Sequence, residues 1–359
     1  MADFKIPPIS TLAGTTIGNY IKVLGKGKVQ KSYYLKVVLT FVVLLIAAPF
    51  HWWERLRFGL FPPKTDVKPP VFILGHWRSG TTFLHNVLCQ DPRAGYVSTY
   101  HGCFPHNLAS KLVFKTFMKV SMPDRRPADR VKLHVDFPQE DEFALGNLLH
   151  VSYYNFFYFP REYSTFYKEA VALQLNKKDL EDWQASYRSL IERALWNTNG
   201  SRAVVKNPVN TGRIRALLQL YPEAKFIYIY RNPITVFLST FKFFDELFPT
   251  LWFQEVDRRF LEDMILDVFV RLMEDYEAQK DLIPEGNLVE LKFEDFDGAP
   301  LATLENLYRE LLQEDFEPCR APMEQYIESQ RSHRMNRYKI PKELLDRIEK
   351  EWGAYITAR

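Results

Sequence analysis

The sequence predicts an α/β fold of three layers, in which helices flank a central and mostly parallel sheet. Short apolar runs typical of buried strands, among them 71–74 and 225–230, alternate with segments that have the periodicity of helices. The sequence GHWRSGTT at 75–82 joins the first run directly to a helical segment. A strand that turns through glycines into a helix is the second observation that favours this fold class.

The individual elements follow in order along the chain. The pattern predicts strands at 71–74, 95–99, 203–206, 225–230 and 287–293, and helices at 81–88, 107–120, 177–197, 208–220, 234–244, 255–280 and 300–313. The stretch 151–167 is dense in aromatic residues without helical spacing, so it either lines a pocket or caps the core. No internal repeat interrupts this alternation.

The first 70 residues differ in character from the rest, and we expect an N-terminal extension at 1–70 and a second domain at 71–359. The extension contains an apolar run at 37–50 and a proline-rich linker at 61–70. The run is shorter than the roughly 20 residues that span a bilayer, but aromatic and basic residues flank it like an interfacial belt. It is therefore a helix on a membrane, a helix buried in the fold, or a spanning anchor. The first alternative gives membrane contact through 37–57.

Composition limits the partners and the compartment. The net charge is only +3, and no basic run is interleaved with aromatics, which argues against nucleic acid as a partner. Three cysteines lack the spacing of a metal site or a disulfide framework, and no cleavage site follows the apolar run, so we expect a cytoplasmic protein, with or without membrane association. The aromatic share of 15% suits an apolar acceptor cavity or a membrane-facing surface.

The turn at 75–80 is a candidate phosphate site, because backbone N–H groups and the positive end of a helix dipole converge there. Its two glycines have the spacing of the nucleotide P-loop, but Thr81 occupies the position where a nucleoside triphosphatase needs lysine. Arg78 is the cation of this turn. The predicted strand 225–230 ends in Arg231, where such enzymes carry an aspartate for Mg²⁺. These differences indicate a nucleotide with phosphates at two places, bound without a metal.

Three segments carry a family resemblance: WRSGTTFL at 77–84, VVKNP at 204–208 and YRNPITVFLS at 230–239 resemble the motifs of PAPS-dependent sulfotransferases. The resemblance implies a P-loop-like fold and 3′-phosphoadenosine 5′-phosphosulfate (PAPS) as the sulfuryl donor, with no metal. It implies that the first motif holds the 5′-phosphosulfate through Arg78, Ser79, Gly80, Thr81, Thr82 and Phe83. It also implies that Arg231 and Ser239 bind the 3′-phosphate, and that Lys206 and Arg78 act at the sulfuryl group.

The acceptor hydroxyl needs a general base. In cytosolic members of the family the base is a histidine two residues after the strand-end lysine, but Pro208 stands there. The chain is therefore closer to the bacterial, broad-type branch of the family. Other branches use a glutamate, which makes Glu140 in the acidic cluster PQEDE the first candidate. Glu142 and His134 are the alternatives, and the sequence leaves the choice open.

The sequence therefore predicts an enzyme that transfers a sulfuryl group from PAPS to a hydroxyl of an apolar acceptor such as a sterol or lipid. A carbohydrate acceptor is the alternative within the same class. The rivals from other classes are a P-loop kinase and a membrane-associated nucleotide-binding protein without catalysis. The resemblance further implies that Arg334 and Arg337 close over the 3′-phosphate, although a solvated basic loop fits the same residues. No feature predicts the oligomeric state.

Overall fold

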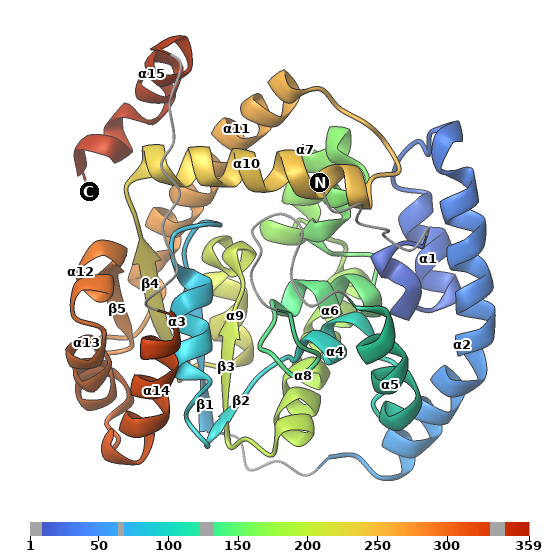
Figure 1. Cartoon of the computed structure of the whole chain (residues 1–359), viewed down its shortest axis with the longest axis horizontal. Helices are drawn as coiled ribbons and strands as arrows, with labels where there is room; N and C mark the ends of the chain where they lie inside the picture. Colours follow the sequence, from blue (N-terminus) through green and yellow to red (C-terminus); the bar gives the residue numbers. More distant parts are fainter. Residues whose placement is uncertain (1–8, 64–67, 123–132, 331–341, 359) are drawn as a thin grey trace. The chain divides into compact units, whose positions relative to one another are not determined.

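Figure 1 shows the computed structural model of the chain, which describes residues 9–63, 68–122, 133–330 and 342–358. The chain divides into two compact units. The N-terminal unit comprises Met1–Asp66, Tyr96–Thr198 and Phe243–Arg258, and the sheet unit comprises Val67–Gly95, Asn199–Lys242 and Arg259–Arg359. Each unit is described by itself below. The division of the sequence at residue 70 into an extension and a domain stays a prediction.

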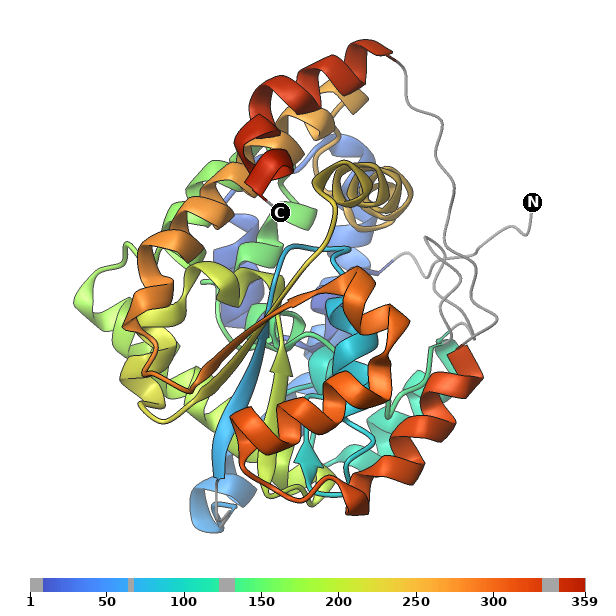
Figure 2. The same ribbon diagram turned by 90° about the vertical axis from the view of Figure 1, so that its left-hand side faces the viewer.

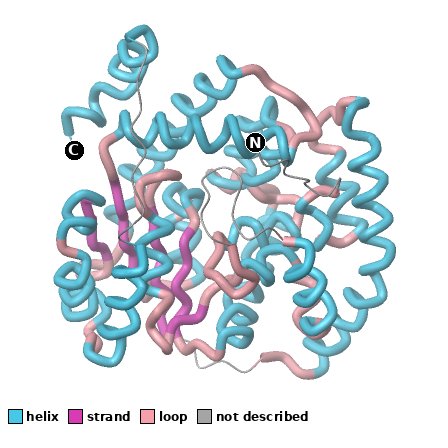
Figure 3. The backbone as a smooth tube through the Cα atoms, in the orientation of Figure 1, coloured by secondary structure: helices cyan, strands magenta, loops and turns pink. Residues whose placement is uncertain are grey.

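The sheet unit is built on a five-stranded sheet, drawn in magenta in Figure 3, in which every pair of neighbouring strands is parallel. The strand order is β2-β3-β1-β4-β5, with β1 (Lys68–Leu74), β2 (Ala94–Gly95), β3 (Arg202–Lys206), β4 (Lys225–Tyr230) and β5 (Leu288–Lys292). This architecture confirms the predicted α/β fold class. The second strand is shorter than the predicted 95–99, because Ser98 instead caps a helix by accepting a hydrogen bond from the His101 N–H.

Helices cover both faces of this sheet, as Figure 2 shows. One face carries α3 (Thr81–Leu88), α12 (Phe293–Gly298), α13 (Pro300–Asn306) and α14 (Glu317–Gln330), and the other carries α9 (Ile214–Leu220) and α11 (Arg258–Gln279). On the first face, a ring nitrogen of His85 lies 3.1 Å from the Val204 carbonyl oxygen of β3. On the second, the Tyr276 ring of α11 stacks on the Tyr228 ring of β4 at 3.9 Å.

The remaining elements of this unit connect these layers or extend them. They are the 3₁₀ helices η6 (Pro208–Gly212) and η7 (Lys280–Leu282), the π-helix η8 (Leu307–Leu312) and α15 (Lys342–Ala358). Helix α10 (Pro233–Leu251) begins in the sheet unit, directly after β4, and ends in the N-terminal unit. Its first turns therefore belong to the same unit as the predicted phosphate turn.

The N-terminal unit is helical. Its helices are η1 (Thr11–Gly14), α1 (Ile17–Leu24), η2 (Lys31–Tyr33), α2 (Tyr34–Leu60), α4 (Thr99–Cys103), α5 (Lys111–Ser121), α6 (Asp141–Leu148), η3 (Tyr153–Phe157), η4 (Pro160–Glu162), α7 (Tyr163–Phe166), η5 (Tyr167–Val171) and α8 (Lys177–Thr198). The aromatic stretch 151–167 is largely buried here, and the rings of Phe156 and Phe157 stack at 4.3 Å beside Phe244 and Phe248. The stretch therefore packs in the core of this unit, and its other expected role, lining a pocket, stays a prediction.

Helix α2 is much longer than the predicted apolar run at 37–50. It continues to Leu60, through Pro49 and Gly59, and its later turns bury His51, Glu54 and Phe58. Among the described residues, Lys31–Leu60 is the one stretch long and apolar enough to cross a membrane, with a mean hydropathy of 2.0. Only 17% of this apolar window is buried.

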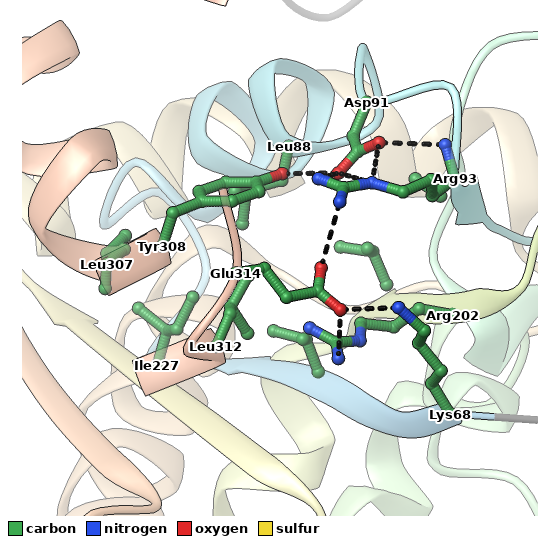
Figure 4. Close-up of a pocket in the computed structure, with 13 residues that line it drawn as sticks. Lys68, Leu88, Asp91, Arg93, Arg202, Ile227, Leu307, Tyr308, Leu312 and Glu314 are labelled. Atoms are coloured by element: carbon green, nitrogen blue, oxygen red, sulfur yellow. Dashed lines mark hydrogen bonds and ion pairs between the residues drawn. The ribbon is translucent and has the colours of Figure 1, made fainter. Parts of the chain in front are cut away.

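A cluster of charges closes the amino edge of the sheet, around a small pocket (Figure 4). Glu314 accepts hydrogen bonds from Lys68 at 2.6 Å and from Arg202 at 3.1 Å, and its second oxygen lies 3.3 Å from Arg93. Lys68 and Arg202 are the first residues of β1 and β3. The pocket has about 20 Å³ of space for a water-sized molecule, which is far too small for a nucleotide. The ion pairs at this amino edge hold β1 and β3 to the segment that contains Glu314. The residues of the three sequence motifs lie at the opposite, carboxyl edge of the sheet.

Among the described residues, His76, His85 and His101 are buried and His106 is half-buried, which makes stability depend on pH. Burial lowers the pKa of His76 to about 4 and the pKa values of His85, His101 and His106 to about 3. In the unfolded chain their pKa is about 6.5, so below that pH the unfolded state binds protons that the folded state does not. Their contribution to stability is therefore complete above the unfolded pKa and is lost as the pH falls.

We expect the free energy of unfolding to drop between about pH 7 and pH 5, by up to roughly 1.4 kcal/mol per pH unit for each buried histidine. Urea unfolding at a series of pH values measures this slope. In a His85→Gln variant the free energy of unfolding should depend less steeply on pH, by the contribution of one histidine. The reason is that residue 85 can then no longer bind a proton in the unfolded state. A free energy of unfolding that stays constant across this range would contradict the prediction.

Candidate active site

The predicted phosphate turn lies between β1 and α3 and depends on its two glycines. Gly75 has a φ of +135° and Gly80 a φ of +95°, in the region that favours glycine. A Cβ atom on Gly75 would lie 2.2 Å from the Ile229 carbonyl oxygen, and one on Gly80 would lie 2.1 Å from the Phe293 ring. The Gly75 N–H donates to the Thr211 hydroxyl at 2.8 Å. The turn is therefore a fixed cradle that only glycine permits at both ends.

The side chains of the turn differ in accessibility. Ser79 and Thr81 are buried, whereas Thr82 and Phe83 are half-buried on the first turn of α3. Phe83 packs against the ring of Phe296 at 5.5 Å, so it contributes packing between α3 and α12. Arg78, at the tip of the turn, has a φ of +67°, an uncommon conformation for a residue with a side chain.

Arg78 connects the first predicted motif to the second. Its Nε–H donates to the Ser239 hydroxyl of α10 at 3.0 Å, although the two residues are 161 positions apart. Ser239 is buried. A second hydrogen bond runs from the Thr240 hydroxyl to the Trp77 carbonyl oxygen at 3.5 Å. The two segments that the sequence assigns to the two phosphate positions thus meet at one place.

Arg231 follows β4 at the same edge of the sheet. Its guanidinium lies 4.6 Å above the Phe293 ring, and its Nε is 3.9 Å from a Glu294 oxygen. The side chain is 16% exposed, so it is largely desolvated. Phe293 thus touches the space beside Gly80 and also supports Arg231. The sequence motifs give Phe293 no role at the site, although its place directly after the last strand is a usable signal.

Lys206 is the last residue of β3, and its side chain is buried, with 3% of the residue exposed. It pairs in register with Ile73 of β1, one residue before the strand ends. Its charge adds to burial in lowering the pKa of His85. Pro208 begins the 3₁₀ helix η6 two residues later and is buried. The end of β3 therefore presents a buried ammonium group. Pro208 occupies the position where cytosolic sulfotransferases carry the histidine base.

Two of the three consecutive acids have structural partners in the N-terminal unit. Asp141 is buried and accepts a hydrogen bond from the Tyr187 hydroxyl at 2.6 Å. Glu142 is fully buried and accepts from the Tyr153 N–H at 2.8 Å and from the Ser152 hydroxyl at 2.9 Å. Both carboxylates hold segments of their own unit together.

Glu140 differs from its two neighbours because it is half-buried at the start of α6. It accepts a short hydrogen bond from the Tyr154 hydroxyl. His134 is more exposed, with 49% of its side chain accessible, and its Nδ1 is 3.9 Å from an Asp136 oxygen. Arg334 and Arg337 lie outside the described residues. Their predicted role, like those of Glu140 and His134, stays a prediction.

The chain resembles known proteins over most of its length. Residues 69–318 match the model described as Sulfotransferase family. Two proteins named Omega-hydroxy-beta-dihydromenaquinone-9 sulfotransferase Stf3, from Mycobacterium bovis and Mycobacterium tuberculosis, are each 28% identical over 328 residues, or 91% of this chain and 84% of theirs. This degree of similarity leaves room for a different acceptor.

Solved structures share the fold. Sulfotransferase STF9 from Mycobacterium avium has a TM-score of 0.67 at 13% identity, covering 96% of this chain and 97% of its own. Sulfotransferase STF1 from M. tuberculosis has a TM-score of 0.66 at 16% identity, covering 95% and 94%. The family match confirms the resemblance carried by the three sequence motifs. The chain belongs to the sulfotransferase family and is an enzyme of that class.

Proposed function

We propose that this sulfotransferase moves the sulfuryl group of PAPS to a hydroxyl of an apolar acceptor, such as a sterol or another lipid. The observation that carries the donor assignment is the hydrogen bond between Arg78 and Ser239, because it joins the turn suited to one phosphate with the helix suited to the other. The glycine cradle also fits, since a Cβ at Gly75 or Gly80 would fill it. Both are properties of the chain's own residues.

The donor-side residues have distinct roles in this proposal. The N–H groups of the turn, with Ser79, Thr81 and Thr82, bind the 5′ end, while Arg231 and Ser239 bind the 3′-phosphate. Bound PAPS supplies an activated sulfuryl group. Lys206 and Arg78 neutralise the charge that develops on the transferred group and the leaving phosphate. Arginine and lysine provide this charge, so the proposed transfer needs no metal.

Glu140 is the proposed general base of the acceptor hydroxyl. Asp141 and Glu142 are less suitable, because each is buried and already accepts hydrogen bonds from its own unit. The hydrogen bond from the Tyr154 hydroxyl orients the Glu140 carboxylate, which is the group that would take the acceptor proton. His134 remains the second candidate.

The relatives named Stf3 support a lipid acceptor, because their name specifies a hydroxylated menaquinone. The aromatic surplus supports it less than the sequence suggested, since many of these rings pack in the core of the N-terminal unit. A sterol and a carbohydrate stay as alternatives for the acceptor. We retain a cytoplasmic location with membrane contact through 37–57 as part of the proposal. Family membership leaves no support for the kinase or the binding protein without catalysis.

Incubation of the enzyme with sulfur-labelled PAPS and a panel of hydroxylated polyprenyl lipids, sterols, phenols and glycans tests the proposal. We expect labelled product from the long-chain lipids. Labelling of glycans alone would replace the apolar acceptor with the carbohydrate alternative. Absence of binding to 3′-phosphoadenosine 5′-phosphate (PAP), measured by calorimetry, would overturn the donor assignment itself.

Gly80→Ala should weaken PAP binding by about tenfold or more. The new Cβ would meet the Phe293 ring that supports Arg231, and the left-handed backbone at this position costs a non-glycine residue about 1–2 kcal/mol. Calorimetric titration with PAP measures the change. Gly298→Ala is the matched control, since a Cβ there meets no atom within 4 Å. Equal affinities of the two variants would remove Gly80 from the donor site.

A further inference from the structure

Helix α2 buries a mixed set of polar and apolar side chains and exposes a row of large apolar ones. The residues that it buries recur every three or four positions: Thr40, Leu44, Ala47, His51, Glu54 and Phe58. Half of them are polar. The opposite face exposes large apolar residues, among them Leu35 (66%), Val38 (57%), Ile46 (67%), Trp52 (69%) and Leu60 (64%). Exposing these side chains to water is unfavourable along the whole helix, and a large exposed apolar surface marks an interaction site.

The buried polar residues attach α2 to its own unit. Glu54 accepts a hydrogen bond from the Ala109 N–H at 2.6 Å and lies 3.2 Å from the Arg193 guanidinium. At the other end of the helix, Lys36 donates to the Thr250 carbonyl oxygen at 2.8 Å. A spanning helix would have to give up these partners or carry charged side chains into hydrocarbon, which is strongly unfavourable. One face of α2 therefore stays on the protein.

Helix α5 adds a second exposed apolar surface. Leu112 is 84% exposed and Val120 is 85% exposed, and Val113 and Phe117 are exposed at 55% and 52%. The two helices touch within the N-terminal unit, where the rings of Phe50 and Phe114 meet edge to face at 5.1 Å. Figure 1 shows both helices, α2 in blue and α5 in dark green. We call the exposed apolar residues of α2 and α5 together the apolar face.

Basic residues outnumber acidic ones around this face, although Lys26 and Lys115 pair with Glu169 and Asp136. Residues 9–63 contain seven lysines and arginines, and their single acid, Glu54, is buried and paired. Residues 106–122 contain three lysines and no acid. A basic rim of this kind complements anionic head groups, which attract lysine and arginine side chains near the membrane surface. It would repel a second copy of the same face.

We propose that the apolar face docks onto an anionic lipid bilayer, with α2 lying in the plane of the membrane and α5 beside it. The Trp52 and Trp53 rings then lie at the level of the head groups, as aromatic residues do in interfacial helices. This extends the membrane contact in the proposed function to a second helix and chooses the lying orientation over the spanning one. The docked enzyme collects a lipid acceptor directly from the bilayer that holds it.

Co-sedimentation of the full-length protein with vesicles tests the docking without any donor or acceptor. We expect binding to phosphatidylcholine vesicles that contain about 30% phosphatidylglycerol, and much weaker binding to phosphatidylcholine alone. Val38→Gln/Ile46→Gln on α2 and Leu112→Gln/Val120→Gln on α5 should each weaken partitioning by about tenfold or more. All four side chains are exposed, so the fold should tolerate the changes. Leu282→Gln, an exposed leucine of the sheet unit, should bind like the wild type.

Lipids brominated near the head group should quench the fluorescence of Trp52 and Trp53, and the Trp52→Phe/Trp53→Phe variant should lose that quenching. Stronger quenching by lipids brominated at the chain ends would instead mean a spanning helix. Failure of the wild type to bind vesicles would overturn the proposal, as would a dimer in light scattering that only the α2 variant dissolves. Neither result bears on the sulfotransferase assignment. That assignment is tested separately by transfer from labelled PAPS to an acceptor dispersed in detergent.

Discussion

Lys206→Met is expected to lower turnover at saturating PAPS by about two to three decades, the usual loss when one preorganised charge-stabilising donor is removed from an active site. Lys206 is buried at the carboxyl end of β3, so its charge is little screened by water. Methionine keeps most of the aliphatic volume and removes only the ammonium. A stopped assay with labelled PAPS and the best lipid acceptor measures the loss.

Turnover per folded molecule separates this catalytic role from a structural one. Lys206 is buried and has partners, and removing one member of a buried set is destabilising. The melting temperature of Lys206→Met should therefore fall, while the loss of turnover persists in the folded fraction. Lys225→Met is the matched control, because Lys225 begins β4 at the opposite end of the strand and pairs with Asn287 at 2.6 Å. Full turnover in Lys206→Met, or an equal loss in Lys225→Met, would remove Lys206 from the mechanism.

The sheet could be predicted well where apolar runs were sharply bounded. The predicted strands 203–206 and 225–230 differ from β3 and β4 by at most one residue, because polar residues flank both runs. The predicted strand 95–99 is wrong beyond Gly95, since the hydroxyl of Ser98 favours a helix cap over a strand. The end of α2 was also missed. Its later turns contain charged residues, and only the folded chain reveals that Glu54 among them has buried partners.

The sequence motifs of the candidate site could be predicted, but the contacts between their residues could not. The spacing of Gly75 and Gly80 indicated the turn, and the family resemblance supplied Arg231 and Ser239. No local pattern, however, indicates that Arg78 reaches Ser239 across 161 positions. The acidic cluster at 140–142 is a second case in which long-range contacts could not be predicted from the sequence. The sequence ranks Glu140 first among three adjacent acids, but it does not reveal the long-range partners, such as Tyr187, that distinguish them in the structure.

Glu140→Gln is expected to lower turnover by about two to four decades, the range of a general-base contribution, while PAP affinity stays unchanged. The amide cannot take the acceptor proton, but it keeps the size of the side chain and an oxygen for the Tyr154 hydroxyl. Calorimetry with PAP and the labelled-transfer assay measure the two quantities separately.

The neighbouring acids make the comparison specific. Glu142→Gln alters a fully buried carboxylate that holds the Tyr153 N–H, so it should lower the melting temperature, with turnover per folded molecule near normal. His134→Ala changes an exposed side chain and should leave both quantities close to wild type. If His134→Ala is inactive and Glu140→Gln is not, the proton passes to the histidine. If both variants turn over normally, the base is another group, and the orientation that Tyr154 gives Glu140 has only a structural purpose.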